Sequence, residues 1–208
     1  EWLLDPYDFT IAASGGNITG ADLSTALSTS TVTIMTSTGK ATNSFGIQLS
    51  TSTTGTTGTG DIIINDNVSF VSSSPTNLFL IAAGGVRGTG NINLGSSNMS
   101  MLNVIQSGNS TYSGNISGAG MVNKDGTGSD NSTGTGNGNW TLTGNNTFGG
   151  LQVNKGRVTF GSATAGNISW VILSSSASNA VSAIGELAFD IATAATFSAG
   201  IGLGMTNA

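Results

Sequence analysis

The stretch GNWTLTGNNTFGG, residues 138–150, carries no charged side chain and alternates apolar with polar residues at its start. Successive side chains of a β-strand point to opposite faces, so Trp140 and Leu142 share one face and Thr141 takes the other. The glycines and asparagines around them tolerate positive φ and suit tight turns. The stretch therefore predicts a half-buried strand between two corners, with Trp140, Leu142 and Phe148 in a core.

The same alternation recurs in short segments along the chain. These segments are Ile62 and Ile64, Ile92 and Leu94, Met99 and Met101, Leu151 and Val153, Val158 and Phe160, and Leu187 with Phe189 and Ile191. Stacked on one another, they would form one apolar column, with Thr, Ser and Asn outside. We predict that the following side chains point inward in one stack: Trp140, Leu142, Leu151, Val153, Val158 and Phe160. Helical patterns are confined to residues 23–28 and 178–189, and the second ends in a strand pattern.

A Gly-Asn/Asp-apolar step recurs along the chain. It begins at Gly16, Gly60, Gly90, Gly114, Gly138 and Gly166, and Phe189-Asp190-Ile191 continues the series without its glycine. Strands repeated at a period in the twenties are typical of a β-solenoid. We therefore expect an all-β fold in which residues 1–208 form a single solenoid of about eight coils of roughly 22–28 residues. With strands about 4.8 Å apart, such a stack is about 40 Å long.

The composition argues against several classes of function. Charged residues are 7% of the chain, against roughly 25% in a typical soluble domain. The net charge is −5 and the five cations are scattered, which argues against nucleic acid as a partner. Without cysteine or histidine there is neither a disulfide framework nor a histidine-based nucleophile. The chain starts at Glu1-Trp2, and we interpret it as an internal piece of a longer protein or a processed product.

Residues 114–161 carry a family resemblance. They follow the pattern I-x-G-x-G, K-x-G, L-T-G-x-N-x-[YF]-x-G and V-x-x-G-x-[VL]-x-[FL]-G. The matching residues are Ile116, Gly118, Gly120, Lys124, Gly126, Leu142, Thr143, Gly144, Asn146, Phe148, Gly150, Val153, Gly156, Val158, Phe160 and Gly161. This segment resembles the passenger-associated repeat of autotransporters, with a polar insertion near 129–137.

The N-terminal segment WLLDPYDFTIAASGGNITGADLSTAL, residues 2–27, resembles large exoproteins of the filamentous haemagglutinin type. Both resemblances imply a right-handed parallel β-helix that belongs to a longer exoprotein, secreted to the bacterial cell surface. The family travels by two-partner secretion or as an autotransporter, so an outer-membrane secretion partner is implied.

Candidate chemistry is sparse. Asp61 and Asp66 are the one close carboxylate pair on an expected strand, but their odd spacing puts them on opposite faces. We predict no catalytic residue, no cofactor and no metal ligand. Lys155 and Arg157 share a face and are candidate surface contacts for an acidic glycan, although a plain solvated face is the simpler explanation.

Two classes of function fit this sequence. The first is a non-catalytic adhesin segment, a rod-like scaffold that binds a glycan or protein on a host or neighbouring cell. The alternative is a self-assembling extracellular filament or matrix protein. A polysaccharide-active β-helix enzyme and an ice-binding solenoid come third, the latter because Thr-x-Thr occurs at 31/33, 51/53 and 141/143 without a constant interval.

Overall fold

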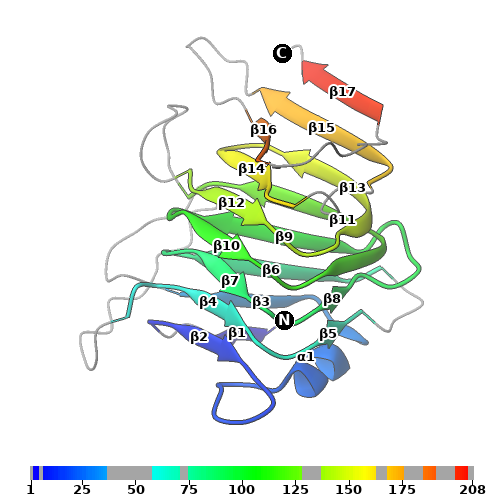
Figure 1. The fold of residues 1–208 in the computed structure, drawn as a ribbon. Helices are drawn as coiled ribbons and strands as arrows, with labels where there is room; N and C mark the ends of the chain where they lie inside the picture. The colour runs from blue at the N-terminus through cyan, green and yellow to red at the C-terminus, as the bar shows by residue number, and fades with distance from the viewer. Residues whose placement is uncertain are drawn as a thin grey trace.

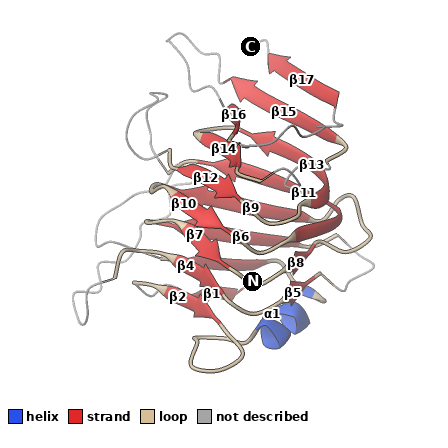
Figure 2. Cartoon of the chain, in the orientation of Figure 1, coloured by secondary structure: helices blue, strands red, loops and turns tan. Residues whose placement is uncertain are grey.

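The computed structural model describes residues 2–4, 7–36, 58–70, 75–127, 137–162, 168–175, 185–190 and 200–205. Within these residues the chain is mostly strand, with one helix, and every pairing between its strands is parallel (Figures 1 and 2). The fold is therefore mostly β, with two parallel sheets, as the sequence predicts.

The larger sheet has ten strands. Eight of them follow the order β1-β3-β6-β9-β11-β13-β15-β17. Their bounds are Trp2–Leu4 (β1), Val32–Met35 (β3), Asn77–Ala82 (β6), Met101–Gln106 (β9), Ile116–Asp125 (β11), Thr147–Val153 (β13), Trp170–Ser175 (β15) and Gly200–Met205 (β17). The two others, β5 (Val68–Ser69) and β8 (Ile92–Asn93), pair with each other, and β8 also pairs with the start of β11.

The smaller sheet has seven strands and lies beside the larger one (Figure 1). Its order is β16-β14-β12-β10-β7-β4-β2. The bounds are Phe9–Ile11 (β2), Ile62–Ile64 (β4), Val86–Gly88 (β7), Ser110–Tyr112 (β10), Asn139–Leu142 (β12), Arg157–Phe160 (β14) and Glu186–Phe189 (β16). From β9 to β17 the chain alternates between the two sheets with every strand, so each strand pairs with the next one of its own sheet.

From β4 onward the register gives repeat lengths that vary from 18 residues, between Asn139 and Arg157, to 30 residues, between Trp170 and Gly200. Ile62 pairs with Val86 and Asn77 with Met101, in both cases 24 residues apart. Ser110 pairs with Trp140, 30 residues apart, because the chain between them holds the extra residues that the sequence places near 129–137. That insertion lies outside the described residues, apart from the buried Asn137.

The core lies between the inner faces of the two sheets. We use the word column for residues that occupy the same register position in successive strands. One column of the larger sheet runs Val32, Leu78, Leu102, Val122, Leu151 and Val171, all buried. The predicted inward residues Trp140, Leu142, Leu151, Val153, Val158 and Phe160 are all buried in the same cluster, which confirms that prediction.

The methionine prediction was wrong. Met99 lies in the loop before β9 with 66% of its surface exposed, and Met101 is only half-buried. Leu102 and Val104 point into the core instead. The prediction had the wrong parity for β9, because Met101 is the first residue of the strand and the even-numbered Leu102 and Val104 face the core. A shift of one residue exchanges the two faces of a strand.

The end of the series also differs from its prediction. Phe189 pairs with Phe160 and stacks on its ring at 5.8 Å, but it is 45% exposed. Leu187 is half-buried against the core, and Ile191 lies outside the described residues. The step that corresponds to Gly156-Arg157-Val158 is Gly185-Glu186-Leu187, not Phe189-Asp190-Ile191.

The Gly-Asn-apolar steps form two columns rather than one series. Asn67, Asn91, Asn115 and Asn145 stack before the strands of the larger sheet. The side-chain oxygen of each of the first three accepts a hydrogen bond from the backbone N–H of the next asparagine in the column. The N···O distances are 2.9, 3.0 and 2.7 Å. Asn139, by contrast, lies at the start of β12 and donates its N–H to Asn109. The sequence interval from Gly114 to Gly138 therefore crosses from one sheet to the other.

Helix α1 (Gly20–Leu27) lies at one end of the stack, beneath β5 (Figure 1). It begins after Thr19, whose hydroxyl accepts from the Asp22 N–H, and it buries Leu23 and Leu27. The Ser24 hydroxyl accepts from the backbone N–H of Ser69 at 2.9 Å, so the helix covers an edge that would otherwise stay unpaired.

The edge of β2 is covered as well. The Thr10 N–H donates to the Asn17 side chain at 2.8 Å, and the Ala12 N–H to the Ile18 carbonyl at 3.0 Å. Asn17 and Ile18 therefore occupy the free edge of β2, the outermost strand of the smaller sheet. Helix α1 has eight residues and is far too short to cross a bilayer. No helix among the described residues is long and apolar enough to do so.

Candidate binding surface

Lys155 and Arg157 both lie beside carboxylates. Arg157 opens β14 and forms an ion pair with Glu186 at 2.7 Å, with both side chains about half exposed. Lys155 precedes β14, and its charge helps to lower the pKa of Asp125, which burial raises above its usual range. The two cations are thus partly neutralised, and their contact with a ligand stays a prediction.

Asp61 and Asp66 lie at opposite ends of β4 and are not brought together. Asp66 accepts from the backbone N–H of Gly20 and of Asn67, both at 2.8 Å. This carboxylate therefore holds the start of α1 against the chain after β4, which is a structural task.

Asp61 also satisfies neighbouring donors. Its carboxylate accepts from the Gly85 N–H at 2.8 Å and the Thr59 hydroxyl at 2.7 Å, and it pairs with Arg87 at 2.9 Å. Burial raises the pKa of Asp61, but the bonds from Gly85, Thr59 and Arg87 outweigh it and hold the pKa below its ordinary value. At neutral pH Asp61 is a fixed anion that links successive strands.

Lys124 is buried in the core, which the sequence analysis did not anticipate. It occupies a column of the larger sheet between two valines, with no exposed side-chain surface. Its Nζ donates to the carbonyls of Asp125 at 2.7 Å and Lys155 at 3.4 Å. Burial lowers the pKa of Lys124 to about 7, with Asp125 acting in the opposite sense. The signal was present, because Lys124 shares its strand parity with the inward Val122.

A bulge in β11 hollows the outer face of the larger sheet. Gly118 pairs with Phe148, but the next pair is Met121 with Gly150, so β11 has one residue more than β13 over this interval. Gly118 adopts φ +105°, which other residues rarely adopt, and a Cβ there would lie 2.7 Å from the Gly95 carbonyl oxygen. Bulges of this kind bend a strand and redirect its side chains.

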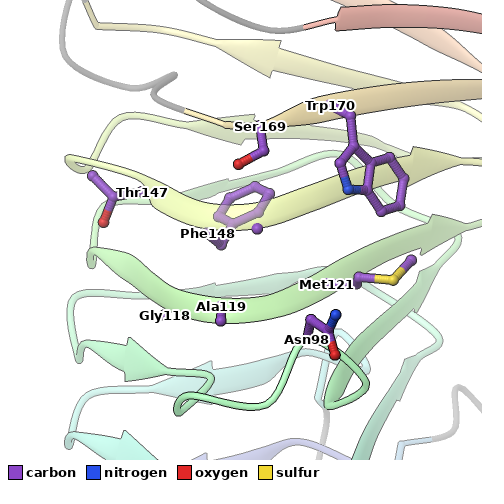
Figure 3. A pocket seen from close by; sticks show the side chains of 9 residues that line it. Asn98, Gly118, Ala119, Met121, Thr147, Phe148, Ser169 and Trp170 are labelled. Carbon is purple, nitrogen blue, oxygen red and sulfur yellow. The ribbon is translucent and has the colours of Figure 1, made fainter.

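Beside this bulge lies an open groove of 580 Å³, which we call the Trp170 groove (Figure 3). Its walls come from the loop before β9, from β11, from β13 and from the start of β15. The side chains that line it are those of Asn98, Ala119, Met121, Thr147, Phe148, Ser169 and Trp170. No sequence pattern identified this groove, because it depends on the register shift in β11.

The Trp170 ring lies against β13 because Gly150 has no side chain. A Cβ at Gly150 would stand 2.3 Å from the indole Cε2 and Cζ2 atoms. Trp170 is half-buried and points away from the core, since its neighbour Val171 points inward. The sheet therefore presents an aromatic ring on its outer surface (Figure 3).

The described residues contain no group of three or more His, Cys, Asp or Glu side chains arranged to hold a metal ion. The Thr-x-Thr pairs at 31/33 and 141/143 do not share a sheet: Thr33 lies in β3 of the larger sheet and Thr141 in β12 of the smaller one. The pair at 51/53 lies outside the described residues. A scan against family models and searches of curated proteins and of solved structures find no match to this chain.

Proposed function

We propose that this chain is a segment of an exported, cell-surface exoprotein that acts as a non-catalytic adhesive scaffold. In this proposal the two parallel sheets are the faces of a right-handed parallel β-helix, and the segment belongs to a longer rod secreted through an outer-membrane partner. The resemblance of residues 114–161 and 2–27 to passenger and haemagglutinin-type exoproteins supports the family. The segment 114–161 covers β11 to β14, two strands from each sheet.

The proposal that the chain is not an enzyme rests on what its carboxylates bind. Asp8, Asp61 and Asp66 each accept backbone N–H bonds that tie one segment to another. Glycoside-cleaving enzymes need two carboxyl groups facing one bond, about 5–9.5 Å apart. Carboxylates that are already occupied by backbone N–H donors support a scaffold better than an enzyme.

The covers on β5 and β2 disfavour growth of a filament through these two edges. Strands stack end to end when an edge offers unpaired N–H and C=O groups. Here α1 covers β5 and the chain's own residues 12–18 cover β2. End-to-end growth through these two edges would require both covers to be displaced.

The test combines assembly, adhesion and turnover on one purified sample. We expect a monomer by sedimentation velocity at all concentrations, retention of protein-coated beads on a cell layer, and no release of reducing ends from polysaccharides. Beads coated with serum albumin are the control. Long fibres by electron microscopy would support the filament instead. Turnover that is lost in Asp61→Asn or Asp66→Asn would place the protein among polysaccharide-active enzymes.

A further inference from the structure

We propose that the Trp170 groove binds a neutral oligosaccharide. This inference rests on the proposed function, since it gives the adhesive scaffold its ligand-contacting site. It places that site on the outer face of the larger sheet, away from Lys155 and Arg157, which would suit an acidic ligand.

The groove is uncharged. None of the residues that line it is Asp, Glu, Lys or Arg. A phosphate or carboxylate ligand would find no cation to replace its water, and a cationic ligand would find no anion. An uncharged ligand escapes that cost, and the volume of 580 Å³ falls within the usual range for small-molecule sites.

The polar side chains of the groove are available for hydrogen bonds. Among the described residues, the side chains of Asn98, Thr147, Ser169 and Trp170 form no hydrogen bond. They offer an amide, two hydroxyls and an indole N–H, which together donate and accept. Sugar hydroxyls likewise donate and accept, so the polar side chains of the groove can form hydrogen bonds with them.

Trp170 supplies the apolar part of the site. Sugar rings have a face of C–H groups between their hydroxyls, and the negative face of an aromatic ring attracts such positive edges. Gly150 removes the Cβ that would push the indole off β13, so the ring has a defined position. The half-buried Met121 side chain lines the same groove from β11, on the other side of β13.

A protein partner is the weaker alternative. Protein interfaces of stable complexes bury about 800 Å² on each side around a hydrophobic centre. The apolar side chains here are the Trp170 indole, the Met121 thioether, the Ala119 methyl group and the ring of Phe148, which is almost fully buried. A groove with one partly exposed ring and several polar side chains suits a chain of sugars better than a protein surface.

The experiment uses the intact chain and three neutral probes: cellohexaose, mannohexaose and chitohexaose. Binding is followed by tryptophan emission and by saturation-transfer NMR, with trigalacturonate as the charged comparison. We expect saturable binding of at least one neutral probe and none of trigalacturonate. Trp170→Ala should weaken binding by about tenfold or more, the loss expected for an aromatic contact.

Two further variants separate a lost site from a lost fold. Ala119 is exposed, so Ala119→Glu should fold and yet abolish binding by filling and charging the groove. Thr111→Ala, exposed on the smaller sheet, should bind as the wild type does. Absence of saturable binding by every neutral probe, or equal binding by Ala119→Glu, overturns the proposal. Because sedimentation and bead adhesion are measured separately, that outcome leaves the scaffold itself standing.

Discussion

Each residue in this chain takes its role from its column. In one column of the smaller sheet, Tyr112, Leu142 and Phe160 lie one above another and all point inward. The Tyr112 hydroxyl donates to the Gly90 carbonyl at 2.5 Å, and its ring lies 5.9 Å from that of Trp140. Buried polar atoms need such partners, so the hydroxyl is accommodated without an unpaired donor.

Phe160 tests the inward face. It is 1% exposed between Leu142 and Phe189 in its column, so Phe160→Ala should lower the free energy of unfolding by about 3–5 kcal/mol. Thr141→Ala, on the outward face, should change it by no more than about 0.5 kcal/mol. Urea denaturation followed by circular dichroism measures both. A larger loss for Thr141→Ala would mean that the two faces are assigned the wrong way round.

Lys124 predicts how stability changes with pH. Burial lowers the pKa of Lys124 to about 7 in the folded chain, against an ordinary pKa of 10.5, so between these values the unfolded chain holds the proton and the folded chain does not. Stability should therefore rise as pH increases from 7 toward 10, by at most about 4 kcal/mol. It should be independent of this group below pH 7, where both states are protonated.

Thermal unfolding from pH 7 to 9.5 measures this slope. That range stays below the titration of Tyr112, whose pKa burial raises above its usual range. Lys124→Met should remove the slope and leave the protein at least as stable at pH 7, whereas Lys155→Met should keep the slope. A flat profile for the wild type would contradict the buried position of Lys124.

At the scale of elements, side-chain amides connect strands where the backbone turns. The asparagine column beside the larger sheet joins β5, β8, β11 and β13 through hydrogen bonds between a side chain and the next backbone. A second set links Asn103, Asn123 and Asn154 on the outer face of the same sheet. These bonds fix which strands are neighbours, in addition to the apolar columns.

Asn115→Ala tests the asparagine column. The substitution removes the acceptor of the Asn145 N–H and should cost about 1 kcal/mol, the net worth of one hydrogen bond. Asn145→Ala is a matched control, because its side chain holds no recorded bond among the described residues. Hydrogen exchange at the Asn145 amide should speed up in the first variant only. Equal losses in both variants would show that the column does not link the strands.

At the scale of the whole molecule, local patterns predicted the class of fold and much of the core. Strand parity correctly placed Trp140, Leu142 and Phe160 inward, because it depends only on neighbouring residues. It failed at Met99, where the chain has not yet entered β9. The order of the strands depends on pairing between distant segments, which a periodic pattern does not show. We therefore predicted one series where the structure has two asparagine columns.

The groove was beyond prediction for the same reason. The Trp170 groove exists because β11 has an extra residue against β13 and because the ring lies over Gly150 on the neighbouring strand. Both features depend on register between strands. Lys155 and Arg157 as ligand contacts stay a prediction. Their carboxylate neighbours could not be predicted from the sequence, because Asp125 lies in β11 and Glu186 in β16.

Disulfide cross-linking tests the parallel register most directly. The chain has no cysteine, so pairs can be introduced without background. Thr111 and Thr141 are register partners in adjacent strands, with Cα atoms about 4.8 Å apart and within reach of a disulfide. Thr111 and Thr159 lie two strands apart, about 9.6 Å, which is beyond that reach. The account predicts rapid oxidation of Thr111→Cys/Thr141→Cys and little of Thr111→Cys/Thr159→Cys in the folded chain; equal oxidation of both pairs, or preference for the second, would contradict it.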